Sequence, residues 1–342
     1  MTSYLRKIEN KVSILQSMDI YHKILDLIDQ HSSFAISAHV NPDGDSIGSQ
    51  LALYSFLADL DKHVRIFNTD PVPPNYHFLP FYDKVEQPCT LDGYSPEVLI
   101  VLDASTLVRI GNHLSKALMP KQVTINIDHH ASADRFGDYN LVESGASSTC
   151  EIVYKLIQLS GTKVGYKRAM ALYTGIMFDT GCFRYSNSTS QVHHIAANLI
   201  DQGIEVDKIY REVYETNPVR RLRLLTKALE TVELTPDGKI AWLVVNQKML
   251  NHTGTTLEDA DGIINQIRSI DTIEVAIMVV SNTREQSKIS MRSKDHVDVG
   301  KICAEFGGGG HARAAGCLID KSYKIALEMV IEVTRKYIAY DD

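Results

Sequence analysis

The sequence predicts an α/β protein with a doubly wound, mainly parallel sheet followed by a smaller α/β domain. The chain has 342 residues, enough for about two domains with a core each. In its first half, short apolar runs alternate with segments of helical periodicity, which is typical of a parallel sheet covered on both faces. After residue 230 the pattern changes to hairpin-connected strands, which indicates a second domain.

The first domain begins with a strand, a polar loop and a helix. The run FAISAHV starts at Phe34, the loop NPDGD follows, and the segment 46–60 carries apolar residues at helical spacing. Further apolar runs predict strands at 63–67, 97–103 and 123–128. Two helices complete this part, one through 151–159 capped by Ser147, Ser148 or Thr149, and one through 169–178.

Residues 188–230 are polar with a helical period, and we expect them to form a helical connector. The first domain then covers 1–187, including an N-terminal extension at 1–18, and the second covers 231–342, with a cleft between them. The second domain opens with a hairpin. Its further elements are a helix near 258–270, strands near 273–281 and 287–292, a helix near 297–305, a glycine-rich loop, a strand near 316–319 and a closing helix.

Composition limits the partners of the chain. With 35 Lys and Arg against 42 Asp and Glu, the net charge of −7 argues against a grip on long duplex nucleic acid. No apolar run approaches the ~20 residues that cross a bilayer, and no secretory signal is evident, so we expect a cytoplasmic protein without a membrane partner. Five cysteines without paired spacing fit neither a disulfide framework nor a thiolate zinc site.

Aspartates and histidines follow the predicted strands of the first domain. They are His39, Asp43, Asp45, Asp103 and the Asp-His-His triplet at 128–130. Segments beyond the carboxyl ends of parallel strands converge on one crevice, so we expect these residues to meet. Taken singly, each motif also fits a turn or a helix cap, but together they favour a functional site.

Several aspartates in one crevice repel one another unless a cation neutralises them, so the cluster predicts a metal site. Carboxylates mixed with imidazoles and without thiolates suit Mn²⁺, with Mg²⁺ or Co²⁺ as substitutes. Asp179, which follows a helix rather than a strand, is a further candidate. The set exceeds the needs of one ion, and two ions bridged by one Asp would support phosphoester hydrolysis.

The segments HVNPDGDSIGS, VLDAS, NIDHH and FDT resemble the four motifs of the DHH phosphoesterase superfamily, named for the triplet at 128–130. The segment FGGGGHARAAG resembles the signature of the DHH-associated domain found in one branch. The resemblance implies that Asp103 bridges two ions, that His130 faces the substrate phosphate, and that Asp128 supports the site from behind. The implied ligands are His39, Asp43 and Asp103 for one ion and Asp45, Asp103, His129 and Asp179 for the other.

An anionic substrate needs positive groups beyond the metal ions, because two divalent ions against four aspartates leave about zero net charge. The second domain can supply them from Arg292, His311 and Arg313, beside glycines that let the backbone approach a phosphate. These glycines are Gly308, Gly309 and Gly310. Arg184 in the first domain is a further candidate, although a local ion pair would explain it equally well.

Within the superfamily, the compact two-domain form resembles a bacterial branch that acts on very short RNA and on 3′-phosphoadenosine 5′-phosphate (pAp). The resemblance therefore implies hydrolysis of dinucleotides and other short oligoribonucleotides to 5′-mononucleotides, and dephosphorylation of pAp. One alternative is hydrolysis of cyclic di-AMP or of linear pApA in signalling. Another is a catalytically silent nucleotide-binding module. Either direction of exonuclease cleavage, 3′–5′ or 5′–3′, and a homodimer are left open.

Overall fold

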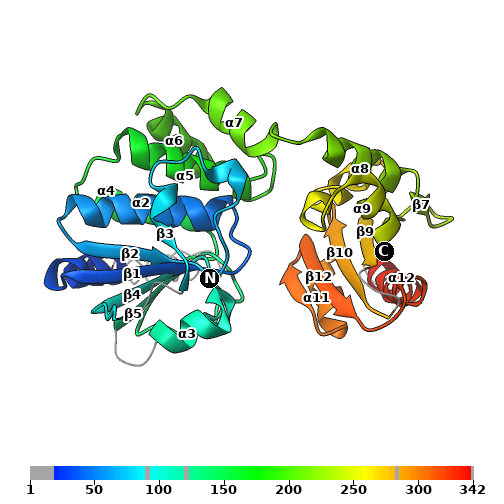
Figure 1. The fold of residues 1–342 in the computed structure, drawn as a ribbon, viewed down its shortest axis with the longest axis horizontal. Helices are drawn as coiled ribbons and strands as arrows, with labels where there is room; N and C mark the ends of the chain where they lie inside the picture. Colours follow the sequence, from blue (N-terminus) through cyan, green and yellow to red (C-terminus); the bar gives the residue numbers. More distant parts are fainter. Residues whose placement is uncertain (1–18, 89–92, 119–122, 282–284, 340–342) are drawn as a thin grey trace, which may run out of the picture. The chain divides into compact units, whose positions relative to one another are not determined.

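The computed structural model describes residues 19–88, 93–118, 123–281 and 285–339. The chain divides into two compact units, Met1–Thr216 and Asn217–Asp342, each with a six-stranded sheet (Figure 1). The predicted extension 1–18 and Cys89 lie outside the described residues. Cys150, Cys182, Cys303 and Cys317 are free thiols. Among the described helices, none combines the length and the apolar character needed to span a bilayer.

The first sheet is built from the apolar runs that the sequence predicts as strands. Its strands are β1 (Ser33–Ala38), β2 (His63–Phe67), β3 (Val85–Glu86), β4 (Val98–Leu102), β5 (Val123–Asp128) and β6 (Tyr139–Val142). They lie in the order β3-β2-β1-β4-β5-β6, and every neighbouring pair is parallel. The strand order changes direction between β1 and β4, which is where open α/β sheets bind ligands.

Helices cover both faces of this sheet, which confirms the doubly wound prediction (Figure 1). The helical segment 19–30, α2 (Gly44–Asp59), α4 (Thr149–Leu159) and α5 (Gly165–Asp179) share one core, and α3 (Asn112–Leu118) lies in the other. Along β1, Phe34 and Ile36 enter the first core and Ala35 enters the second. Because side chains alternate along a strand, burial on both faces requires a nearly continuous apolar run.

The range 188–230, expected as a connector, contains three helices that belong to different units. They are α6 (Ser190–Ile200), α7 (Val206–Tyr214) and α8 (Val219–Leu229). Leu199 of α6 and Ile209 of α7 are buried in the core of the first unit, whereas Leu224 of α8 is buried in the second unit. Each helix has an apolar stripe that a core must cover, so the division between the units lies after Thr216.

The second unit holds a mixed sheet in the order β11-β12-β10-β9-β8-β7, in which only β8 and β9 pair in parallel among the described strands. The predicted hairpin is present as β7 paired with β8. The strands are β7 (Glu233–Leu234), β8 (Ile240–Asn246), β9 (Val275–Ser281), β10 (Ser287–Ser293), β11 (Gly309–His311) and β12 (Ala314–Ile319). The helices α11 (Val299–Glu305) and α12 (Tyr323–Ala339) pack on one face, and α8, α9 (Gln247–Thr253) and α10 (Ile264–Arg268) pack on the other.

The glycine-rich segment differs from the loop that the sequence predicts. Gly309, Gly310 and His311 form β11, an edge strand paired antiparallel with β12. Gly308 precedes this strand, and a Cβ atom at this position would lie 2.2 Å from the carbonyl oxygen of Gly316. The missing side chain therefore allows two backbones to pack closely, and the segment is held by ladder hydrogen bonds.

Candidate metal centre

The predicted metal ligands converge at the carboxyl edge of the first sheet. His39 follows β1, Asp103 follows β4, and the triplet at 128–130 ends β5. Asp103 has a φ of +54°, a left-handed conformation that is uncommon outside glycine and often marks a functional position. Two helix ends complete the set, because Asp45 lies in the first turn of α2 and Asp179 is the last residue of α5.

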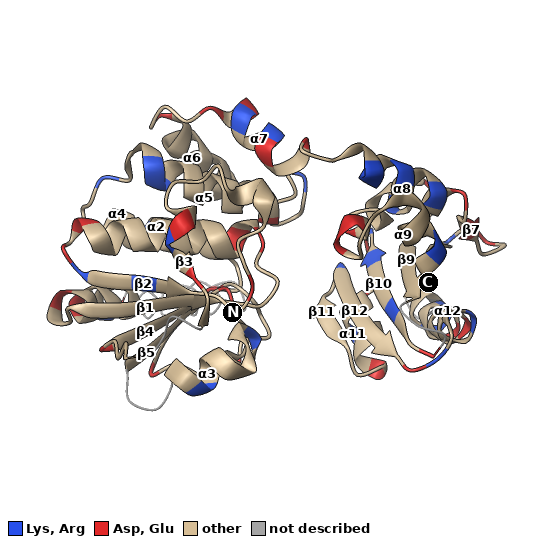
Figure 2. Cartoon of the chain, in the orientation of Figure 1, with Lys and Arg blue, Asp and Glu red and all other residues tan. Residues whose placement is uncertain are grey.

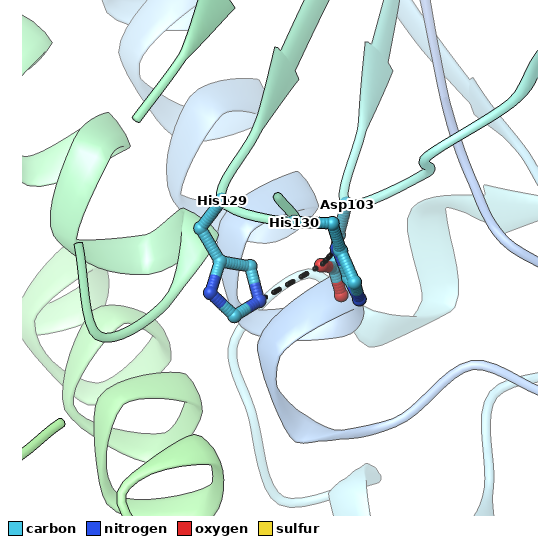
Figure 3. Close-up of side chains that lie close together, drawn as sticks. All are labelled: Asp103, His129 and His130. Carbon is cyan, nitrogen blue, oxygen red and sulfur yellow. Dashed lines mark ion pairs between the residues drawn. The ribbon is translucent and has the colours of Figure 1, made fainter. Parts of the chain in front are cut away.

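Asp103 lies at the middle of the cluster and is only 3% exposed. Its Oδ2 atom is 3.4 Å from Nε2 of His39. Its Oδ1 atom is 3.6 Å from both Nε2 of His129 and Nδ1 of His130, which approach it from the end of β5 (Figure 3). The two oxygens of one carboxylate therefore face different imidazoles.

Among the residues that the structure describes, three overlapping groups of side chains have ligand atoms within 4.8 Å of one another. They are His39 with Asp43 and Asp103, Asp45 with His129 and Asp179, and Asp103 with His129 and His130. The first two groups match the ligand sets implied by the sequence motifs, except that Asp103 meets the second set through His129. His130 also reaches this cluster, although the motifs assign it to the substrate.

Hydrogen bonds orient the imidazoles. Nδ1 of His39 lies 2.8 Å from the carbonyl oxygen of Val40, which can only accept, so Nδ1 carries the proton and Nε2 faces the carboxylates. Nδ1 of His130 lies 2.7 Å from Oδ1 of Asp128, and the same oxygen accepts from the backbone N–H of His129 at 2.9 Å. Asp128, fully buried, thus supports the two histidines from behind.

The electrostatics of the cluster favour a cation. Burial lowers the pKa of His39, but the carboxylates of Asp103 and Asp43 outweigh burial and raise this pKa to about 11. At His129 the neighbouring carboxylates likewise outweigh burial and raise the pKa to about 10. Burial raises the pKa of Asp179 to about 6, and burial also raises the pKa of Asp45, with nearby carboxylates adding to both shifts. Positive charge at this place therefore stabilises the buried carboxylates.

The convergence of Asp179 depends on a close approach of α2 and α5. A Cβ atom on Gly48 would lie 2.4 Å from the carbonyl oxygen of Ala171, and one on Gly175 would lie 2.3 Å from Sγ of Cys150 and 3.0 Å from Cα of Asp45. Only glycine permits this spacing, which brings Nε2 of His129 within 3.1 Å of Oδ2 of Asp179. We call Gly44, Gly48 and Gly175 the glycine seam, because Gly44 packs against Phe178 of α5 in the same way.

One contributor was not predicted. Thr149, the first residue of α4, donates its hydroxyl to Oδ1 of Asp103 at 3.2 Å and its backbone N–H to Oδ2 of Asp45 at 2.6 Å. The sequence marks this residue only as part of a helix cap. The signal available was a hydroxyl residue at the start of the first described helix after the triplet.

The residues predicted to bind the substrate lie in both units. Nε of Arg184 donates to the carbonyl oxygen of Gly181 at 2.8 Å, and Nη1 of Arg313 donates to the carbonyl oxygen of Val297 at 3.1 Å. Arg292 and His311 are both register partners of Ala314, so these side chains share one face of the second sheet. On this face of the sheet, α8, α9 and α10 cover a buried core. No described residue of β10, β11 or β12 belongs to that core.

The basic run at 220–227 lies along α8, where Figure 2 shows Lys and Arg in blue. Nε of Arg220 lies 3.3 Å from Oδ2 of Asp259. Nη1 of Arg221 donates to Asn217 at 2.8 Å, and its Nη2 donates to the carbonyl oxygen of Asp261. These contacts within the second unit support the solvated helix face that such a run usually represents.

Comparisons with known proteins identify two family domains in this chain. Residues 33–176 match the DHH family, N-terminal domain, and residues 237–339 match the DHHA1 domain. The bifunctional oligoribonuclease and PAP phosphatase NrnA of Thermus thermophilus is 32% identical over 305 residues, 87% of this chain and 89% of that protein. The protein of the same name from Bacillus subtilis is 28% identical over 314 residues, 90% of this chain and 93% of that one.

A solved structure extends the match to the fold. An exopolyphosphatase-related protein from Bacteroides fragilis is 28% identical, with a TM-score of 0.87 over 94% of this chain and 96% of that chain. The DHH match includes the strand ends at His39, Asp103 and the triplet, and the DHHA1 match includes the glycine-rich segment. The chain therefore belongs to the DHH family, with an N-terminal DHH domain followed by a DHHA1 domain.

Proposed function

We propose that this chain is a metal-dependent phosphoesterase that hydrolyses very short oligoribonucleotides to 5′-mononucleotides and dephosphorylates pAp. The observation that carries this proposal is the position of Asp103. Its two oxygens lie 3.4 Å and 3.6 Å from imidazoles of two different ligand groups, as a carboxylate shared by two ions requires.

The donor set fits divalent cations that accept nitrogen and oxygen ligands. His39 presents Nε2 to the carboxylates because its Nδ1 is bonded to a backbone carbonyl. No thiolate belongs to the ligand groups found among the described residues, so Mn²⁺ is the ion that we propose, with Mg²⁺ and Co²⁺ as substitutes. When bound, two such ions would supply Lewis acidity for water and for the phosphoryl oxygens.

The protein's own groups would orient the substrate around this centre. We propose that His130 binds a phosphoryl oxygen, because Asp128 fixes its Nδ1 and leaves Nε2 as the outer nitrogen. Arg292 and His311, which share an open face of the second sheet with Ala314, would bind further phosphate or ribose oxygens. Gly309 and Gly310 beside them expose backbone without side chains. Arg184, Gly308 and Arg313 are further candidates. Each of these arginines donates to a backbone carbonyl oxygen, as Arg292 also does to that of Met291, and close packing fixes the glycine.

The choice of substrate rests on the relatives. The proteins from Thermus thermophilus and Bacillus subtilis are both named bifunctional oligoribonuclease and PAP phosphatase, and the match spans 89% and 93% of their lengths. The two family matches include His39, Asp43, Asp45, Asp103 and His129 of the proposed ligands and the glycine-rich segment, whereas Asp179 follows the DHH match.

The test is turnover of a diribonucleotide, a 24-residue single-stranded RNA, pAp, pApA, cyclic di-AMP and pyrophosphate at equal concentration with Mn²⁺. We expect the diribonucleotide and pAp to be hydrolysed fastest and turnover to stop on chelation. Preference for cyclic di-AMP or pApA would move the protein to nucleotide signalling. Tight nucleotide binding without any turnover would instead identify a silent binding module.

A further inference from the structure

We infer that Thr149 is a positioning residue that couples two carboxylates of the metal centre. This inference rests on the proposed metal site. Thr149 is fully buried and makes two polar contacts to different aspartates, one from its backbone and one from its side chain. Among the described residues, its hydrogen bonds go to these two aspartates, so we expect its effect to pass through Asp45 and Asp103.

The first turn of α4 holds the carboxylate of Asp45. The backbone N–H of Thr149 donates to Oδ2 at 2.6 Å, and the backbone N–H of Cys150 donates to Oδ1 at 2.8 Å. These N–H groups have no partner inside the helix, and the positive end of the helix dipole favours a carboxylate there. Asp45 is fully buried, so these donors replace water and fix both of its oxygens.

The side chain of Thr149 contacts the second carboxylate, that of Asp103. Its hydroxyl donates to Oδ1 of Asp103 at 3.2 Å, the oxygen that faces His129 and His130. One residue thus fixes the separation of Asp45 and Asp103, whose negative charges would otherwise push them apart. A carboxylate that is oriented by a hydrogen bond binds a metal more tightly, because less freedom is lost on binding.

The start of α4 is itself anchored to the sheet. Oγ of Ser148 caps the helix by accepting from the N–H of Glu151 at 3.1 Å. Lys155 pairs with Glu151 at 2.8 Å and with Glu143 at 2.9 Å, and the backbone N–H of Glu143 donates to the carbonyl oxygen of Asp128. The position of Thr149 relative to the triplet is therefore set by a continuous chain of contacts rather than by packing alone.

Two substitutions separate the hydroxyl from the rest of the residue. Thr149→Val keeps the size, the branching and the backbone N–H to Asp45 but removes the donor to Asp103. Thr149→Ser keeps the donor. Thr174→Val is the matched control, because Thr174 is equally buried in the same unit and its hydroxyl donates only to the carbonyl oxygen of Met170 in its own helix.

The affinity for Mn²⁺ is measured by calorimetric titration of the full-length protein after chelation, with thermal unfolding as the check on folding. We expect Thr149→Val to weaken Mn²⁺ binding roughly tenfold, a typical loss for a group that orients a ligand. Thr149→Ser should return the affinity close to the wild-type value, and Thr174→Val should leave it unchanged.

Unchanged Mn²⁺ affinity in Thr149→Val would overturn the inference, as would an equal loss in Thr174→Val or the absence of rescue by serine. Turnover of the diribonucleotide is followed in parallel. A wild-type protein that binds Mn²⁺ but hydrolyses nothing would overturn only the proposed function, because the ratio of metal affinities still decides the role of Thr149.

Discussion

The carboxyl edge of the first sheet and the open face of the second sheet both gather polar groups, but in opposite ways. At the first, Asp45 and Asp103 are at most 3% exposed and are surrounded by imidazoles and helix N–H donors. At the second, His311 is exposed and lies beside Ala314 and glycine backbone. Buried, fixed carboxylates suit metal-dependent chemistry, whereas an exposed edge strand with glycine backbone suits contact with a ligand.

The largest expected effect is on the buried side of this comparison. Asp103→Asn should reduce turnover of the diribonucleotide by at least roughly 1,000-fold, because an amide cannot supply two anionic oxygens to the cluster. The fold should persist, since the amide has nearly the same shape. Steady-state kinetics and circular dichroism measure both quantities. Asp201→Asn, at the exposed C-terminal end of α6, is the control, and unchanged turnover in Asp103→Asn would remove the shared ligand from the mechanism.

Packing of the glycine-rich segment gives the next effect. Gly308→Ala should destabilise the second unit by about 1–3 kcal/mol, because the new methyl group would overlap the backbone of Gly316 and the side chain of Cys317. Gly309→Ala is the matched control for stability, since a Cβ atom there meets nothing within 4 Å. The single tryptophan, Trp242, lies on β8 of the second unit, so its fluorescence during denaturant unfolding reports this unit.

Equal stability of the two alanine variants would contradict the close packing described for Gly308. A loss confined to Gly308→Ala would instead show that the second glycine of the run is needed for backbone packing and that the third is not.

A smaller effect should distinguish recognition from chemistry. Arg292→Gln should raise the KM for the diribonucleotide about tenfold and change kcat little, because a charged hydrogen bond to substrate is lost while the metal ligands are untouched. Lys301→Gln, an exposed cation on α11 in the same unit, controls for net charge. A fall in kcat at constant KM would indicate that Arg292 stabilises the transition state. The second sheet would then contribute to chemistry as well as to recognition.

The smallest effect concerns the opposite edge of the first sheet. Glu97, just before β4, accepts from the backbone N–H groups of Ser32 and Ser33, and these bonds lower its pKa to about 2. Its folded form binds a proton less readily than the unfolded form, so its stabilising contribution is present above the ordinary pKa near 4.5 and is lost as pH falls toward 2.

Thermal unfolding between pH 6 and pH 3 should therefore decline less steeply in Glu97→Gln than in the wild-type protein. Glu215→Gln, an exposed carboxylate of the same unit, should keep the wild-type slope. Identical slopes in all three proteins would show that Glu97 contributes nothing to the acid sensitivity of the first unit.

The sequence predicts the centre of the first sheet well, because strands buried on both faces must be nearly continuous apolar runs. It misses β3 and β6, which have two and four residues and only partial burial, so that no periodicity marks them. It also treats 188–230 as one connector, although the apolar stripes of α6 and α8 are buried in different cores. A helical period indicates that the apolar side of a helix must be buried, but it does not indicate which core buries it.

The same limit applies to the candidate site. The strand-end positions of His39 and Asp103 follow from parallel topology, which brings the carboxyl ends together. The position of Asp179 does not, since it depends on glycines that let two helices approach. Thr149 was assigned only to a cap because its second contact joins residues 46 positions apart, a distance that no local pattern encodes.

The glycine seam also fixes a length along α5. Gly175 meets α2, and Asp179 lies four residues later, slightly more than one turn of helix. One residue inserted between them would rotate Asp179 by roughly 100° about the helix axis and turn it away from His129. An insertion before Gly165 would leave this spacing intact. The number of residues between Gly175 and Asp179 therefore sets the position of this ligand in the metal centre. Insertions before Gly165 are compatible with the site, whereas insertions between Gly175 and Asp179 are not.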